Sequence, residues 1–179
     1  MSKIGKKPIS LQNLQVEIKG QDVHYKGKNG TGVYTLPEFI IPEVVNQELF
    51  LKLKNGKDKR KFWGLHRALL ANELKGINQL FERKMQIVGL GFKAELAGSK
   101  IKFSLGFSHK IEKNLPKGVT FEVDKTGQIL TLKSADKEQL GQFCADIKAL
   151  RPPEPYKGTG IKMEGERIRR KAGKTKAAA

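Results

Sequence analysis

The sequence predicts an α+β fold of two tandem, duplicated domains, each an antiparallel sheet with one covering helix, followed by a basic C-terminal arm. Three observations support this prediction. Strand-like segments precede one amphipathic helical stretch, this order occurs twice in 179 residues, and a strongly basic segment ends the chain. One helix on one face of an antiparallel sheet forms a two-layer α+β domain. The predicted domains are 1–82 and 83–179, with the arm at about 151–179.

The first copy begins with strand-like segments. Apolar and polar residues alternate between residues 16 and 26, and again in 33–37 and 49–53, as they do in strands with one buried face. A helix is predicted over about 58–73, because apolar residues recur there with the helical period. Gly76 is the predicted stop of this helix.

The second copy repeats the first in the same order. Strand-like alternation appears in 94–104 and 119–132, and a second amphipathic helix is predicted over 137–150. The pair Leu36-Pro37 recurs as Leu115-Pro116, an offset of 79 residues. A nearly constant offset over most of a domain indicates internal duplication, with the boundary near residues 81–83.

The charge balance indicates the class of partner. The chain has 35 Lys and Arg against 18 Asp and Glu, a net charge of +17 and a pI near 10. Such a chain repels itself unless an acidic polymer neutralises it. The most basic stretch lacks the bulky apolar residues of a membrane-surface helix. Nucleic acid is therefore the favoured partner, and no membrane is expected.

Several classes of protein are excluded by what the sequence lacks. No apolar run approaches the roughly 20 residues of a membrane helix. The single cysteine, Cys144, allows no internal disulfide, which favours a reduced, cytosolic setting. It lies on the apolar stripe of the second predicted helix, so we expect a buried structural thiol. His24, His66 and His109 have no zinc-binding spacing, and no metal site is predicted.

One motif leaves an enzymatic alternative open. Gly89-Leu90-Gly91-Phe92-Lys93-Ala94 matches the pattern G-x-G-x-x-A of dinucleotide-binding proteins after an apolar strand. That site needs a helix to begin at the glycines, so that its first amides hold the pyrophosphate. The residues that follow are typical of a hairpin instead. The favoured interpretation is a glycine-rich bend, with no cofactor and no small-molecule substrate.

The strongest functional candidates lie in the C-terminal arm. Pro152, Pro153 and Pro155 stiffen an extended segment, and the aromatic residue that follows can stack on a base or ribose. Glycines let the backbone approach a phosphate, and the basic residues continue a positive track. The tail 167–176 has no apolar period and is not expected to fold unaided. The predicted contact residues are Tyr156, Lys157, Gly158, Gly160, Lys162, Arg167, Arg169, Arg170 and Lys171.

Two further basic segments are weaker candidates. Ser108, His109 and Lys110 form a small donor-rich cluster that could meet a phosphate or a base edge, with a plain solvated turn as the alternative. The lysines and arginine within 52–61 are candidates for a secondary phosphate contact.

At the arm the sequence resembles a known family. The segments 152–158, 160–162 and 165–166 closely resemble the C-terminal signature of the bacterial large-subunit ribosomal protein six family. Residues 4–9, 87–94 and 104–109 look like its N-terminus, its interdomain segment and one of its loops, in the same order along almost the whole chain. The resemblance implies two duplicated α+β domains, no catalytic activity and no cofactor.

The resemblance also implies a place and partners. Members of this family bind large-subunit rRNA near the base of the acidic stalk and the factor-binding region, mainly through the second domain and the C-terminal arm. Their neighbours are other stalk-base ribosomal proteins. The expected location is the ribosome, in the cytoplasm or in an organelle. The alternative function is that of a generic basic protein that compacts nucleic acid.

Overall fold

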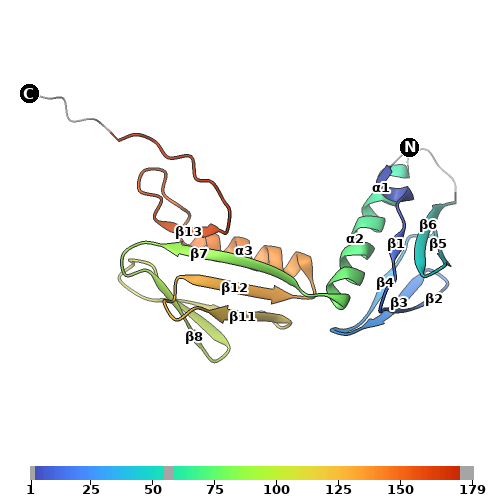
Figure 1. Ribbon diagram of the computed structural model, residues 1–179, viewed down its shortest axis with the longest axis horizontal. Helices are drawn as coiled ribbons and strands as arrows, with labels where there is room; N and C mark the ends of the chain where they lie inside the picture. The colour runs from blue at the N-terminus through green and yellow to red at the C-terminus, as the bar shows by residue number, and fades with distance from the viewer. Residues whose placement is uncertain (1–2, 55–58, 174–179) are drawn as a thin grey trace, which may run out of the picture. The chain divides into compact units, whose positions relative to one another are not determined.

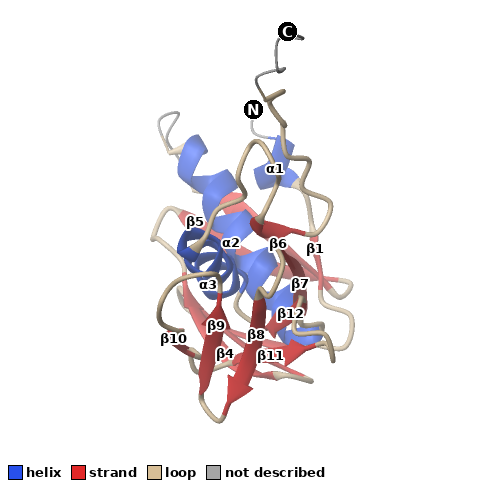
Figure 2. Cartoon of the chain, turned by 90° about the vertical axis from the view of Figure 1, so that its left-hand side faces the viewer, coloured by secondary structure: helices blue, strands red, loops and turns tan. Residues whose placement is uncertain are grey.

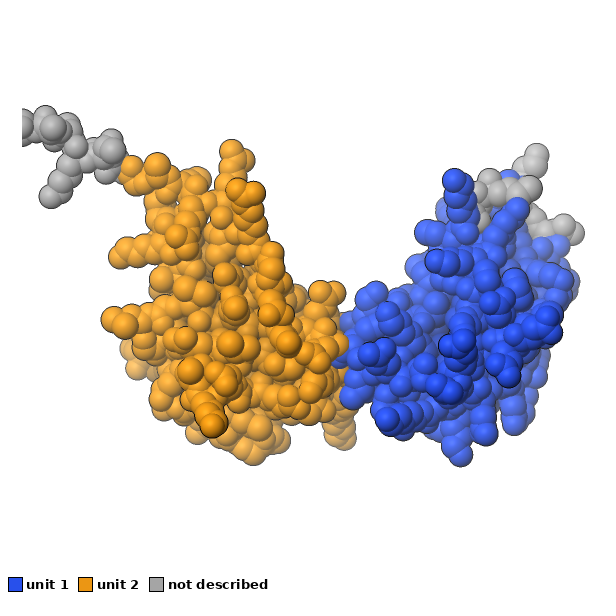
Figure 3. Space-filling view, viewed as in Figure 1, with its two compact units in different colours: residues 1–81, 135–137 blue, residues 82–134, 138–179 orange. Residues whose placement is uncertain are grey.

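The computed structural model describes residues 3–54 and 59–173. The chain divides into two compact units (Figure 3). Unit 1 comprises Met1–Phe81 together with Ala135–Lys137, and unit 2 comprises Glu82–Ser134 together with Glu138–Ala179. Each unit contains sheets and one long helix, so the structure confirms the α+β fold class.

Unit 1 contains two three-stranded antiparallel sheets rather than the single sheet expected. Their strand orders are β1-β6-β5 and β2-β3-β4. The helix α2 packs on both sheets and buries Trp63, Leu70 and Leu74 against them. The elements are α1 (Lys3–Lys6), β1 (Ile9–Ser10), β2 (Gln15–Lys19), β3 (Asp22–Gly27), β4 (Gly30–Thr35), β5 (Ile40–Val45), β6 (Glu48–Leu53) and α2 (Arg60–Asn78).

Unit 2 also contains two sheets. Strands β10-β9-β8 form one, and β11-β12-β7-β13 form the other. Figure 1 shows α3 lying along β7, and Figure 2 shows β8, β9 and β10 side by side. The elements are β7 (Phe81–Val88), β8 (Lys93–Ala97), β9 (Lys100–Ser104), β10 (Ile111–Asn114), β11 (Val119–Val123), β12 (Ile129–Ser134), α3 (Lys137–Leu150) and β13 (Gly160–Met163).

The two units repeat each other down to single hydrogen bonds. The Leu11 N–H donates to the Gln47 carbonyl at 2.9 Å, and the Ile87 N–H donates to the Gln128 carbonyl at 2.8 Å. The same arrangement of three strands occurs in both units, with the last of the three in sequence paired to each of the other two. The sheet β1-β6-β5 of unit 1 corresponds to the strands β7-β12-β11 of unit 2. Unit 2 differs by one added strand, β13, which pairs with β7.

The helix predictions were nearly correct. The predicted bounds 137–150 agree with those of α3. The predicted stop of α2 at Gly76 was wrong, because the helix continues to Asn78. Gln79 ends it by turning to an extended conformation (φ −141°), and its N–H still donates to the Lys75 carbonyl at 2.8 Å. The predicted start at Asp58 lies outside the described residues.

Candidate nucleic-acid interface

The segment after α3 forms a closed loop with an exposed tip. The Glu154 N–H donates to the Thr159 carbonyl, and the Gly158 N–H donates to the Glu154 carbonyl, both at 2.9 Å. These two bonds close the loop on itself. Tyr156 is 53% exposed at its tip, beside the exposed Lys157. The loop therefore offers one aromatic face and one cation to a partner.

The chain then returns to unit 2 as β13. The Ile161 N–H donates to the Arg151 carbonyl at 2.8 Å, and β13 pairs antiparallel with β7. Gly160 is buried at φ +135°, and a Cβ on it would lie 2.6 Å from the Pro152 carbonyl oxygen. The close backbone approach at Gly160 is thus to the chain itself, and a contact of Gly160 with RNA stays a prediction.

A carboxylate anchors the turn that follows β13. Glu166 accepts a hydrogen bond from the Lys148 ammonium of α3 at 2.5 Å and another from the Met163 N–H at 3.1 Å. The bond from Lys148 is the main reason why the pKa of Glu166 lies below its usual value. The Glu164 N–H adds a bond to the Lys84 carbonyl of β7 at 2.9 Å. These contacts fix where the basic tail leaves unit 2.

The tail itself folds back along the loop as far as Lys171. The Lys171 N–H donates to the Pro155 carbonyl at 2.8 Å, and the Arg170 guanidinium lies against Gly158. Residues 166–173 form no helix or strand, and the expectation that residues 167–176 do not fold unaided stays a prediction. Residues 174–176 lie outside the described residues.

The structure brings most of the predicted contact residues to the surface of one segment. It holds Gly158 and Gly160 inside the loop and leaves Lys162 half-buried on β13. The exposed members of the predicted set are Tyr156, Lys157, Arg167, Arg169, Arg170 and Lys171.

The weaker candidates Ser108, His109 and Lys110 are all exposed in the loop between β9 and β10. The neighbouring Phe107 ring lies 5.0 Å from the Arg151 guanidinium carbon, so this loop contacts the base of the arm. The second predicted segment and the arm are thereby brought together. Arg151 was missed by the sequence analysis, since no local pattern marks two side chains so far apart in sequence as neighbours.

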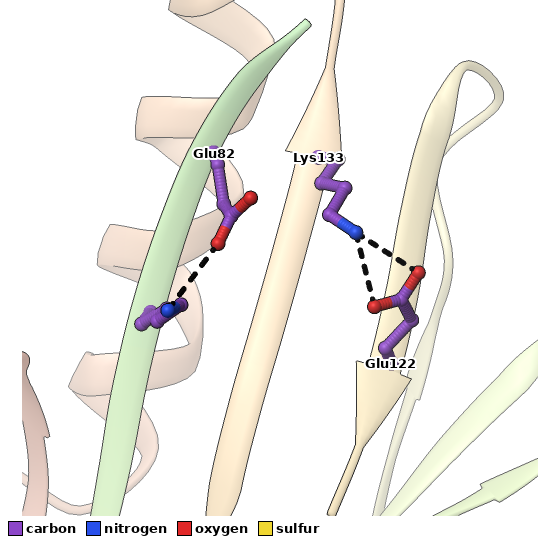
Figure 4. Close-up of polar contacts among 4 residues, drawn as sticks. Glu82, Glu122 and Lys133 are labelled. Atoms are coloured by element: carbon purple, nitrogen blue, oxygen red, sulfur yellow. Dashed lines mark hydrogen bonds and ion pairs between the residues drawn. The ribbon is translucent and has the colours of Figure 1, made fainter.

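Most lysines on the sheets of unit 2 have carboxylate partners. In the four-stranded sheet, Lys133 of β12 lies 3.1 Å from Glu122 of the adjacent strand β11 (Figure 4). Within β7, Lys84 pairs with Glu82 at 3.6 Å. Lys93 pairs with Glu95 on the other sheet. Among the described residues, no such ion pair forms at the exposed cations of the arm, which are Lys157, Arg167, Arg169, Arg170 and Lys171. The arm thus presents a basic segment whose described cations are free of ion pairs with protein carboxylates.

The basic cluster within 52–61 is less suited to phosphate than its composition suggests. Lys52 pairs with Glu43 at 2.5 Å. The ammonium groups of Lys59 and Lys61 lie over the rings of Phe39 and Phe62, at 5.1 and 5.0 Å from their centroids. Lys57 lies outside the described residues.

The structure offers no support for the enzymatic alternative. The strand β8 follows Gly89-Leu90-Gly91, so the helix N-terminus that a dinucleotide needs does not form there. Cys144 is buried, as expected, and burial raises the pKa of its thiol. His66 contacts the Tyr34 hydroxyl at 2.9 Å. No group of metal-ligating residues occurs among the described residues, and none of the helices in that part of the chain could span a bilayer.

Comparison with known proteins identifies the family. The family Ribosomal protein L6 matches residues 88–164, which include β8 to β13 and the arm loop. The large ribosomal subunit protein uL6 of Syntrophomonas wolfei is 46% identical over 176 residues, covering 97% of this chain and 98% of that protein. The uL6 proteins of Myxococcus xanthus and Synechococcus sp. are 45% and 41% identical, each over 98% of both chains. The chain therefore belongs to the ribosomal protein L6 family.

Proposed function

We propose that this chain is a structural protein of the large ribosomal subunit, and that unit 2 and its arm bind 23S-type rRNA. The observation that carries the proposal is the row of exposed cations from Arg167 to Lys171, which the bond from the Lys171 N–H to the Pro155 carbonyl joins to the loop. Its relatives bear the name of a large-subunit protein, which supports the same assignment. The expected site is near the base of the acidic stalk, beside other stalk-base proteins and the factor-binding region.

The mechanism combines charge with shape. Each Lys or Arg that contacts a phosphate releases condensed counterions, and this release is favourable at low salt. Contacts to phosphate carry no sequence information by themselves. Tyr156 supplies an aromatic face on which an unpaired base can stack, as is common in RNA recognition. The bond from the Lys171 N–H to the Pro155 carbonyl joins the tail to the loop, so that the cations of both lie on one segment that a folded RNA surface can contact.

Binding of the full chain to large-subunit rRNA fragments tests the proposal. A triple charge reversal in the arm, Arg169→Glu, Arg170→Glu and Lys171→Glu, is compared with Lys19→Glu, Lys26→Glu and Lys28→Glu, three exposed positions of unit 1. Both variants change the net charge equally. We expect the arm variant to bind at least about 100-fold more weakly than the wild type. The plot of log K against log salt should also become shallower, with the magnitude of its slope smaller by about two to three. The unit 1 variant should lose less than about tenfold.

Competition distinguishes the alternative function. Excess tRNA and duplex DNA should not displace the wild-type chain from its fragment if the site is specific. Equal displacement by every competitor, together with equal losses in both charge-reversal variants, would favour a generic nucleic-acid-compacting protein instead.

A further inference from the structure

Arg151 makes contacts that tie three separate segments of unit 2 together. Its guanidinium carbon lies 5.2 Å from the centroid of the Phe92 ring and 5.0 Å from that of the Phe107 ring. Phe92 belongs to the glycine-rich bend before β8, and Phe107 to the loop between β9 and β10. Arg151 itself stands at the base of the arm. A planar guanidinium can stack on aromatic faces in a way that the ammonium of lysine cannot.

The backbone of the same residue holds the arm. The Arg151 carbonyl accepts the Ile161 N–H at 2.8 Å, the bond with which the returning chain enters β13. One residue thus contacts the bend and the β9–β10 loop through its side chain, and the returning arm through its carbonyl.

The two loops are also packed closely against each other at this point. Gly106 has φ +76°, and a Cβ on it would lie 2.8 Å from the Phe92 ring. The bend is closed by a bond from the Phe92 N–H to the Gly89 carbonyl at 3.3 Å. Between them Leu90 is fully exposed at the tip. Movement of Phe92 or Phe107 would therefore shift the surface that each loop presents.

The described residues of unit 1 lack this arrangement. At the offset of 77 residues that relates the two long helices, the position of Arg151 corresponds to Leu74, which is buried in the core of unit 1. The contact of one guanidinium with two aromatic rings is therefore a feature of the unit that carries the exposed cations of the arm.

We propose that Arg151 is a positioning residue for RNA binding: in contact with the rings of both Phe92 and Phe107, its guanidinium holds the loop with Ser108–Lys110 and the glycine-rich bend in register with the arm, so that the three present one surface. This inference rests on the proposed function. In it Arg151 acts through its neighbours and makes no phosphate contact of its own.

The first test is made on the free chain by hydrogen exchange. Arg151→Lys keeps the charge and removes the planar guanidinium that contacts both rings, and Arg83→Lys is the matched control at an exposed position of β7. In Arg151→Lys the amides of 89–92 and 106–110 should exchange at least about fivefold faster, with those of β12 unchanged as evidence that unit 2 remains folded. The control should exchange as the wild type does. Unchanged exchange of both loops in Arg151→Lys would overturn the proposal.

The second test measures affinity for the rRNA fragment in two backgrounds. Arg151→Lys should weaken binding about five- to twentyfold in the wild-type chain and less than twofold when Phe107→Leu is already present. Equal losses in both backgrounds would mean that Arg151 contacts RNA directly, and an unchanged affinity would mean that the contact with the two rings has no role in binding; either result overturns the positioning role.

The two proposals fail in different ways. A wild-type chain that binds no rRNA fragment specifically overturns the proposed function. Specific wild-type binding that is insensitive to Arg151→Lys leaves the proposed function intact and overturns the positioning role alone.

Discussion

The two units close the same sheet edge by different means. In unit 1 the Arg67 side chain of α2 donates from Nε to the Lys7 carbonyl at 2.9 Å and from Nη2 to the Pro8 carbonyl at 2.6 Å. In unit 2 the carbonyl that corresponds to Pro8, that of Lys84, accepts the Glu164 backbone N–H at 2.9 Å. A guanidinium thus serves in one unit where a returning segment of chain serves in the other.

The helices show how the sequence permits this difference. Arg67 corresponds, at the helix offset of 77, to Cys144, a short and fully buried side chain. At this edge of the unit 2 sheet, β13 pairs with β7, and its residue Ile161 is buried. An open sheet edge invites pairing with other strands, so each copy must cover it. Unit 1 thus covers this edge with a side chain of its own helix, and unit 2 uses the edge to hold the arm.

The largest expected effect comes from Gly160→Ala, which attacks the added strand. The new Cβ would meet three backbone atoms of 151–153 at 2.6 to 2.9 Å, and these cannot move aside as side chains can. We expect β13 to lose about 3 kcal/mol of stability. Hydrogen exchange at the Ile161 amide measures this loss.

Gly165→Ala is the matched control for that substitution. Gly165 also has positive φ, +77°, but its Cβ would meet nothing within 4 Å. It should cost only the conformational strain, about 1 kcal/mol. If Gly160→Ala releases β13 while β11, β12 and β7 stay protected, the sheet of unit 2 is a duplicate plus an addition. Unfolding of all four strands together would contradict that comparison.

An intermediate effect is expected from Arg67→Cys, which places the unit 2 residue in unit 1. No strand arrives there to replace the guanidinium, so the carbonyls of Lys7 and Pro8 lose their donor. The expected cost is about 1–2 kcal/mol in the unfolding of unit 1. Trp63 is the single tryptophan and is buried in that unit, so urea unfolding followed by its fluorescence reports on unit 1.

Arg60→Cys, at an exposed position of the same helix, is the control for Arg67→Cys. It should change the stability of unit 1 by less than about 0.5 kcal/mol. An Arg67→Cys variant as stable as this control would mean that the edge of β1 needs no cover, and that the correspondence between the two edges has no energetic meaning.

The features that the sequence alone could predict are those that depend on residues close together in the chain. The apolar stripe of α3 gave its bounds, and the repeated pairs such as Leu36-Pro37 and Leu115-Pro116 revealed the duplication. A helical stripe and a repeat are periodic, and periodicity is carried by neighbouring residues. The separation of strands into two sheets in each unit was not predicted, because pairing depends on contacts between distant segments.

The same distinction between local patterns and distant contacts applies to the candidate site. The exposed cations and Tyr156 could be named because charge and aromatic character are read directly from the sequence. For Gly160 the sequence indicates a close approach to the backbone but not what approaches it, and in the structure the chain at Pro152 does so. Nor could the sequence show that Arg151 meets Phe92 and Phe107, because that contact is created by the sheet topology.

The smallest expected effect is a pH dependence of local stability at the edge of the unit 2 sheet, which the corresponding edge of unit 1 should not show. Because the pKa of Glu166 is lower in the folded state, its carboxylate adds stability at pH values above its unfolded pKa, and this contribution is lost as the pH falls through the folded pKa. The contribution is under about 1 kcal/mol, since the pair with Lys148 is partly exposed. Exchange of the Met163 amide, corrected for its intrinsic rate, should therefore accelerate in acid.

Glu166→Gln should abolish this dependence, and Glu164→Gln, at the exposed neighbouring carboxylate, should retain it. The Arg67 contacts in unit 1 join a guanidinium to two carbonyls, none of which titrates in acid, so they should persist over the same range. Acid dependence that survives in Glu166→Gln would show that another group anchors the arm, and would remove this difference between the two edges.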